Sequence, residues 1–165
     1  MNSKKVAFLG IAIALVFVAT QIKIPVPITQ GYVNLGDGVI LICSYLAGPF
    51  AAIPGAVGSA LADLTAGYSQ YALPTFIIKG LVALVSSLIL KTSAAEPSFI
   101  KKLLAFIAAE LFMAGGYLAF ESLPFMYGFK AAILSFPFNL IQGACAVIIG
   151  MAVTSPKTIK FNSFR

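Results

Sequence analysis

The chain consists mostly of apolar runs of the length needed to cross a bilayer, separated by proline, glycine or charged residues. A spanning helix needs about 20 largely apolar residues, with a range of about 17 to 25. The sequence predicts six such helices, at Val6–Ile22, Val33–Gly48, Phe50–Gly67, Ala72–Leu90, Ile100–Phe120 and Ala131–Val153. Gly48-Pro49 predicts a tight turn between the short second and third helices. The predicted fold is an all-α integral membrane protein with a single domain over residues 1–165.

The composition agrees with a chain that lies in lipid. Of the 165 residues, 60% are hydrophobic and 10% are charged, which leaves no room for a large soluble domain. Eleven Lys and Arg residues against five Asp and Glu residues would suit a nucleic-acid binder. The cations lie between the apolar runs and form no basic stripe, so the predicted partner is the lipid bilayer and not nucleic acid.

The placement of the cations predicts the topology. Six spans put both termini on one side of the membrane, and loops rich in Lys and Arg favour the cytoplasm. Lys23 and Lys130 would then be exterior. The cations expected on the cytoplasmic side are Lys4, Lys5, Lys91, Lys101, Lys102, Lys157, Lys160 and Arg165. Both termini are therefore predicted to be cytoplasmic.

Asp37, Asp63 and Lys79 lie inside three different apolar runs, at a similar predicted depth. A charge at the centre of a bilayer costs about 2.5 to 3.5 kcal/mol on insertion scales, so these residues should face protein or a water-filled pocket. Two interpretations remain open: a structural charge network in which one or both aspartates neutralise Lys79, or direct contact between Lys79 and a ligand.

Several catalytic signatures are missing from the sequence. It has no His, no G-x-x-x-x-G-K-[ST] phosphate loop, and no nucleophile with a base at a recognisable spacing. The sequence therefore predicts neither an enzyme nor a bound metal or cofactor. Any ATP hydrolysis would have to come from a partner.

Small residues form stripes on two of the predicted helices. Ala7, Gly10 and Ala14 recur along the first helix, where close approach could serve internal packing or docking onto another subunit. For the third helix, internal packing is the favoured interpretation. Its stripe contains Ala52, Gly55, Ala56, Ser59, Ala62 and Ala66.

Polar residues share faces on the remaining helices and predict a pocket. At 1.5 Å per residue, Lys79 and Asn139 lie roughly 10 to 12 Å below the exterior ends of their helices. This depth predicts a pocket in the outer half of the bundle, lined by helices four to six, with the loop Lys23–Tyr32 as a possible lid. The shared faces are Asn34, Asp37 and Ser44; Thr75, Lys79 and Ser86; Glu110, Tyr117 and Glu121; and Ser135, Asn139 and Gln142.

The stretch from Gly31 to Leu81, GYVNLGDGVILICSYLAGPFAAIPGAVGSALADLTAGYSQYALPTFIIKGL, follows a first helix that ends in QIKIPVP. This region resembles the substrate-binding S component of energy-coupling factor (ECF) vitamin importers. It is similar in particular to the riboflavin-type group, which includes proteins assigned to hydroxymethylpyrimidine or pyridoxine. Helices five and six agree mainly in length, polarity and position.

The resemblance implies a six-helix S component in a bacterial cell membrane. Such a protein binds a vitamin from outside and associates with a membrane T component that carries two ATPase subunits. In that family the small-residue face of the first helix docks onto the T component, which maps onto Ala7, Gly10 and Ala14. Gly10 departs from the Ala that is usual in such motifs.

The family's ligand pocket also maps onto this sequence. Pyridoxine or hydroxymethylpyrimidine suits its neutral donors and acceptors better than riboflavin does. The residues that the resemblance implies for substrate binding are Tyr71, Thr75, Lys79, Tyr117, Glu121, Asn139 and Gln142. The alternative is a self-sufficient ion-coupled secondary transporter or channel, in which Asp37, Asp63, Lys79 and Glu110 would form an ion path.

Overall fold

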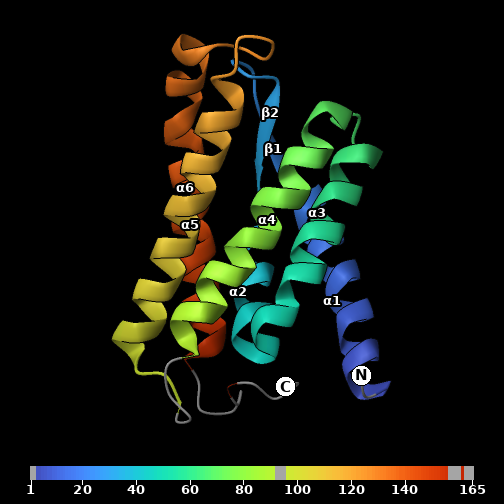
Figure 1. Ribbon diagram of the computed structural model, residues 1–165, viewed down its shortest axis with the longest axis vertical. Helices are drawn as coiled ribbons and strands as arrows, with labels where there is room; N and C mark the ends of the chain where they lie inside the picture. Colours follow the sequence, from blue (N-terminus) through green and yellow to red (C-terminus); the bar gives the residue numbers. More distant parts are fainter. Residues whose placement is uncertain (1–2, 92–95, 156–160, 162–165) are drawn as a thin grey trace.

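The computed structural model describes residues 3–91, 96–155 and 161. These residues form a bundle of helices with a short β-hairpin at one end (Figure 1). The elements in chain order are α1 (Ser3–Gln21), β1 (Lys23–Val26), β2 (Gly31–Asn34), α2 (Gly36–Ala47), the 3-10 helix η1 (Gly48–Ala51), α3 (Ala52–Thr65), α4 (Ser69–Leu90), α5 (Phe99–Glu121) and α6 (Phe129–Thr154).

Within the described residues, five segments are long and apolar enough to cross a bilayer. Four of them are α1, α4, α5 and α6, and the fifth is the 30-residue stretch Gly36–Thr65, which contains α2, η1 and α3. The chain is thus a multi-pass membrane protein, and its mostly helical architecture agrees with the predicted fold class.

The stretch Gly36–Thr65 is two helices and not one. Asp37 bonds to Lys79, and Ser44 bonds to Ser86, so α2 runs in the same direction as α4. After η1 the chain turns back, and α3 runs beside α4 in the opposite direction (Figure 1). Gly48 begins the turn with a φ of 59°, a left-handed conformation that glycine adopts without strain. The predicted turn at Gly48-Pro49 is confirmed.

The two ends of the bundle differ in what they carry. The hairpin end carries residues 23–34, the α3–α4 turn at 66–68 and the α5–α6 loop at 122–128. The terminal end carries the start of α1, η1 and the end of α6. The half of the bundle nearest each end is called the hairpin half and the terminal half below.

Helix α2 is too short to reach from one end to the other. Its 12 residues span about 18 Å, little more than half of the roughly 30 Å hydrocarbon core. The antiparallel hairpin of β1 and β2, paired from Lys23–Asn34 to Val26–Gly31, occupies the space beyond its first residue (Figure 1). Non-helical backbone is tolerated at membrane depth where protein surrounds it. The hairpin therefore fills the space between the start of α2 and that end of the bundle.

The hairpin corrects two predictions. The all-α prediction did not include strands, and the region Lys23–Tyr32 was expected to be an irregular loop. The second span was predicted to begin at Val33, which lies in β2, whereas α2 begins at Gly36. Helix α4 begins at Ser69, three residues before the predicted start, so Tyr71 lies on the helix and not in the preceding loop.

The small residues of α3 pack inside the bundle. A Cβ at Gly55 would lie 2.9 Å from the carbonyl oxygen of Lys79, and one at Gly58 would lie 2.8 Å from the carbonyl oxygen of Ile13. Glycine at these positions lets α3 approach α4 on one side and α1 on the other. The predicted internal packing of this helix is confirmed.

The stripe on α1 faces outward. This helix buries Leu9, Ala12, Val16 and Thr20 against its neighbours. Ala7, Gly10 and Ala14 are all exposed, and no atom lies within 4 Å of a Cβ built at Gly10. Within the described residues, the small face of α1 is therefore not used for packing.

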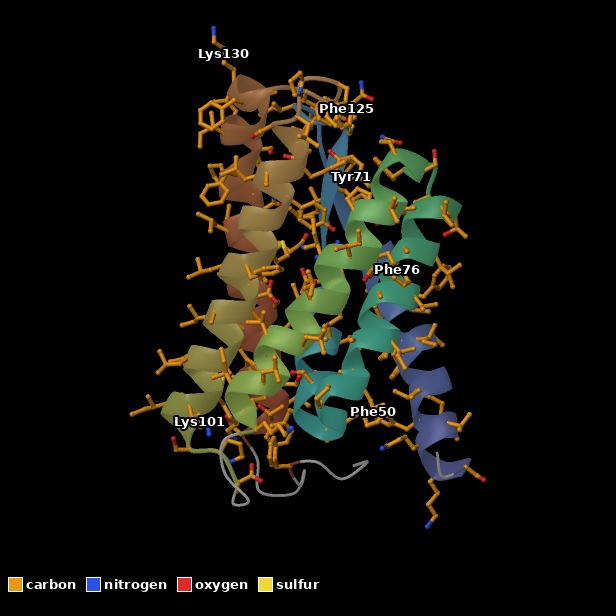
Figure 2. All side chains as sticks on the ribbon, in the orientation of Figure 1. Phe50, Tyr71, Phe76, Lys101, Phe125 and Lys130 are labelled. Atoms are coloured by element: carbon orange, nitrogen blue, oxygen red, sulfur yellow. The ribbon has the colours of Figure 1, made fainter. Side chains whose placement is uncertain are left out.

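Cations gather at the terminal end. Lys4 and Lys5 lie in the first turns of α1, Lys91 follows α4, and Lys101 and Lys102 lie in the first turn of α5. Lys101 and Lys130 lie at opposite ends of the molecule (Figure 2). Three further cations predicted for the cytoplasmic side, Lys157, Lys160 and Arg165, lie outside the described residues.

Candidate substrate-binding site

A polar cavity lies in the hairpin half of the bundle. Its lining comes from α1, the hairpin, α3, α4, α5 and α6. All seven residues that the sequence predicts for substrate binding line it: Tyr71, Thr75, Lys79, Tyr117, Glu121, Asn139 and Gln142. The structure thus brings together residues from three helices, and their role in binding stays a prediction.

An ion pair forms the base of the cavity. Lys79 Nζ lies 2.7 Å from each carboxylate oxygen of Asp37, and the side chains are 2% and 0% exposed. Gln142 Nε2 donates to Asp37 Oδ2 at 2.5 Å. Gln142 Oε1 accepts from the Asn34 backbone N–H at 2.7 Å. These bonds neutralise both charges and tie α2, α4, α6 and the hairpin together.

Asp63 is not part of this ion pair. Its Oδ1 accepts a 2.5 Å hydrogen bond from the Tyr32 hydroxyl, and its Oδ2 has no hydrogen-bond partner in the described part of the chain. The predicted charge network of Asp37, Asp63 and Lys79 is therefore corrected to the pair Asp37–Lys79. The Tyr32 hydroxyl is the donor of this bond, because a carboxylate oxygen only accepts.

Helices α4 and α5 contribute a hydrogen-bonded wall. The hydroxyls of Thr75 and Tyr117 lie 2.9 Å apart, and Lys79 Nζ lies 5.2 Å from the centroid of the Tyr117 ring. The face of an aromatic ring attracts a cation, so Tyr117 helps to hold the Lys79 ammonium group. Both hydroxyls on this wall thus have partners within the protein.

The rim of the cavity joins the hairpin to α4, α5 and α6. The Tyr71 hydroxyl lies 2.8 Å from the Thr29 carbonyl oxygen and 3.0 Å from Glu121 Oε1. Ser135 donates to the other Glu121 oxygen. Tyr71 lies near the upper end of α4, beside the strands (Figure 2). Its ring stacks on Tyr127 at a centroid distance of 6.4 Å, so Tyr71 packs within the bundle.

The wall formed by α1 and α3 was not predicted. Thr20 from α1, with Ser59 and Asp63 from α3, lines the cavity on this side. The hydroxyl oxygens of Thr20 and Ser59 have no hydrogen-bond partner among the residues described, like Asp63 Oδ2. Ser59 appeared in the sequence only as one member of a small-residue stripe, and no periodic signal marked Thr20.

The cavity is small, and hairpin residues form part of its wall. Its volume of about 30 Å³ suits roughly two water molecules. A six-membered ring with substituents would need more room than this volume offers. The bonds that hold the hairpin are those of Tyr32 to Asp63, Tyr71 to Thr29 and Asn34 to Gln142.

Glu110 lies apart from the cavity. Its side chain is 4% exposed, and neither carboxyl oxygen has a hydrogen-bond partner among the described residues. It lines a separate apolar groove of about 370 Å³ between α5 and α6, next to Gly143. Across the described ranges, no cluster of three or more His, Cys, Asp or Glu side chains could hold a metal ion.

Comparison with known proteins identifies the family. A family model described as "ECF-type riboflavin transporter, S component" matches residues 1–159. The chain belongs to this family. As an S component it is the substrate-specific subunit of an ECF-type transporter, a class of binding subunits and not of enzymes.

Two curated relatives resemble this S component. It is 34% identical to the "Thiamine precursor transporter HmpT" of Lactococcus lactis subsp. cremoris (strain MG1363), over 99% of this chain and 95% of that protein. It is 33% identical over 130 residues to an "Uncharacterized protein in gap 3'region" of Pyrococcus woesei, over 78% of this chain and 84% of that protein.

Proposed function

We propose that this S component captures hydroxymethylpyrimidine, a thiamine precursor, outside the cell and passes it to an ECF transporter for ATP-driven uptake. The observation that carries the proposal is the polar cavity in the hairpin half, lined by hydroxyl, amide and carboxyl groups. Such convergent polar groups in a buried site fix the orientation of a small ligand. The similarity to a relative named as a thiamine precursor transporter supports the same cargo.

The cavity favours a small ring over a large one. The lining offers neutral hydroxyl and amide groups, such as those of Thr20, Ser59 and Asn139, for hydroxyl and ring-nitrogen contacts. Riboflavin carries three fused rings and a sugar-like chain, and a cavity of about 30 Å³ would have to open far more for it than for one pyrimidine ring. Pyridoxine is the next candidate by size and polarity.

The proposed topology is a single six-helix domain with both termini in the cytoplasm. The cations at the terminal end support it, because positively charged loops stay on the cytoplasmic side. The hairpin end would then face outward, which places the cavity where a vitamin precursor arrives.

The proposed partners are a membrane T component and two ATPase subunits. Membership of the S-component family supports this assembly. The exposed face of Ala7, Gly10 and Ala14 is the proposed docking surface on α1, because small side chains let another helix approach closely.

The direct test is equilibrium binding to the purified chain in detergent. Hydroxymethylpyrimidine, pyridoxine, riboflavin and thiamine are compared by calorimetry and by ligand-induced thermal stabilisation. A ligand at 100 times its Kd stabilises the folded state by about 2.7 kcal/mol, and we expect hydroxymethylpyrimidine to bind most tightly. A Cys145→Ala variant, changed at an exposed site outside the cavity, should bind equally well. Tighter binding of another vitamin would identify that vitamin as the cargo. No binding of any of the four by folded protein would reject the proposal of vitamin capture.

A further inference from the structure

The polar atoms on one wall of the cavity are unpaired. Thr20, Ser59 and Asp63 are 2%, 1% and 3% exposed, yet each presents an oxygen without a hydrogen-bond partner among the described residues. Native proteins leave few buried polar atoms unpaired, and each such atom calls for an explanation. Three of them line one cavity, on two adjacent helices.

Apart from Asn139, the polar side chains named on the opposite wall already have partners. Thr75 pairs with Tyr117, Glu121 accepts from Ser135, and Gln142 is bonded to Asp37. The free hydrogen-bonding capacity of the cavity therefore lies mainly on α1 and α3.

We propose that Thr20, Ser59 and Asp63 form a subsite that reads an amino group beside a ring nitrogen. The inference rests on the proposed function and deepens it, because it states which edge of the pyrimidine is recognised. A carboxylate oxygen only accepts hydrogen bonds, so Asp63 Oδ2 needs an N–H or O–H donor. A hydroxyl also donates, so Thr20 or Ser59 can bond to a neighbouring ring nitrogen.

Hydroxymethylpyrimidine offers this pattern and pyridoxine does not. In hydroxymethylpyrimidine the exocyclic amino group sits on the carbon next to a ring nitrogen, which places a donor beside an acceptor. In pyridoxine the ring nitrogen lies between a methyl-bearing carbon and a C–H. The subsite thus distinguishes hydroxymethylpyrimidine from pyridoxine, a ring of similar size, by one hydrogen-bond donor.

Neighbouring residues hold the subsite in place. The Tyr32 hydroxyl engages Asp63 Oδ1 and so leaves Oδ2 to face the cavity. A Cβ at Gly36 would overlap the Thr20 hydroxyl, so glycine at this position makes room for that oxygen. Both supports come from the segment 32–36, where the hairpin leads into α2.

The test compares three ligands with two forms of the full-length protein. The ligands are hydroxymethylpyrimidine, its analogue without the amino group, and its 4-oxo analogue, which carries a carbonyl in place of the amino group. The proteins are wild type and Asp63→Asn. In this variant the Tyr32 hydroxyl should hold the amide oxygen, which turns the amide N–H groups toward the ligand.

For wild type we expect the amino ligand to bind about 10- to 100-fold more tightly than either analogue, as for a hydrogen bond to a charged group. Asp63→Asn should lose this preference and bind the 4-oxo analogue most tightly. Equal wild-type affinity for the three ligands, or an equal loss for all three in the variant, would overturn the subsite. A wild-type protein that binds none of them would instead overturn the proposed function.

A second measurement covers the case in which Asp63→Asn does not fold. Thr20→Val and Ser59→Ala remove the unpaired hydroxyls with little change of shape, and each should weaken binding of the amino ligand about 5- to 10-fold. Without ligand, both variants should unfold at the same temperature as wild type or higher, because no internal bond is lost. The matched control Ser87→Ala removes a buried hydroxyl that bonds to the Leu84 carbonyl, and it should leave ligand affinity unchanged. Lower stability with unchanged affinity at Thr20 and Ser59 would overturn the assignment.

Discussion

The two halves of the bundle treat buried polar side chains differently. In the terminal half, Ser44 and Ser86 bond to each other at 2.7 Å, and Lys102 Nζ donates to the Thr154 carbonyl at 2.7 Å. In the hairpin half, paired groups such as Thr75 and Tyr117 lie beside Thr20 and Ser59, which have no partner among the described residues. Satisfied polar groups fix one packed arrangement, whereas unpaired ones keep binding capacity for a ligand. The contrast assigns stability to one half and recognition to the other.

The pair Asp37–Lys79 lies at the boundary between the halves, so its loss should have the largest effect. Lys79→Met leaves the Asp37 carboxylate buried without its counter-ion, which typically costs about 3 to 5 kcal/mol. We expect a sharp fall in the unfolding midpoint in detergent.

The double variant Asp37→Leu with Lys79→Met is the control, because it removes both charges and should recover much of the lost stability. A Lys79→Met protein that keeps full thermal stability but binds no ligand would contradict the structural role. Lys79 would then be a direct ligand contact.

The next effect is expected outside the cavity, on α1. Ala14→Phe places a large side chain on the exposed small face and should reduce capture of the T component at least about tenfold, or about 1.4 kcal/mol. Co-purification with the T component measures this, and vitamin binding should not change. Leu15→Phe, on the same helix and already large and exposed, is the matched control. Normal assembly of Ala14→Phe would remove this surface from the interface.

A smaller effect is expected from Asn139 in the cavity. Asn139→Ala removes one polar contact and should weaken ligand binding about tenfold, while the unfolding midpoint of the ligand-free protein stays the same. Calorimetry and thermal unfolding of the same preparation measure both. Unchanged affinity would exclude Asn139 from the site. Lost stability would mean that polar side chains of the hairpin half also stabilise the fold, as those of the terminal half do.

The smallest effect on ligand affinity should come from the terminal half. Ser44→Ala leaves Ser86 without its hydroxyl partner and should cost about 1 to 2 kcal/mol of stability with no change in ligand affinity. The double variant with Ser86→Ala should cost less than the sum of the single variants, because no unpaired hydroxyl remains. Weaker ligand binding by Ser44→Ala would contradict the division between the halves.

The sequence predicted the long helices well because their signal is strong and local. The predicted span Ile100–Phe120 differs from α5 by one residue at each end. The polar faces of α4, α5 and α6 followed from side-chain spacing of three and four residues, which places such residues on one side of a helix. Six of the seven cavity residues lie on these faces, whereas Tyr71 precedes the predicted start of the fourth helix and was implied by the family resemblance.

Other features depend on contacts that spacing does not encode. The strands are four residues each, and Pro25 and Pro27 hide any alternation, so the hairpin looked like a loop. Asp37 and Asp63 lay at similar predicted depths, and only the approach of α2 to α4 selects Asp37 as the partner of Lys79. The place of Thr20 and Ser59 in the cavity depends on α1 and α3 forming one of its walls, which residue spacing does not encode.

The half-length helix α2 also bears on how the protein is made. Twelve residues are too short to span a bilayer independently, and the aspartate in the first turn needs a partner within the protein. The groups that neutralise and hold Asp37 are Lys79 and Gln142, and both are synthesised later in the chain. We therefore expect α2 to settle only after α4 and α6 have been inserted, which makes the final topology a late step of biogenesis and the sixth helix a requirement for it.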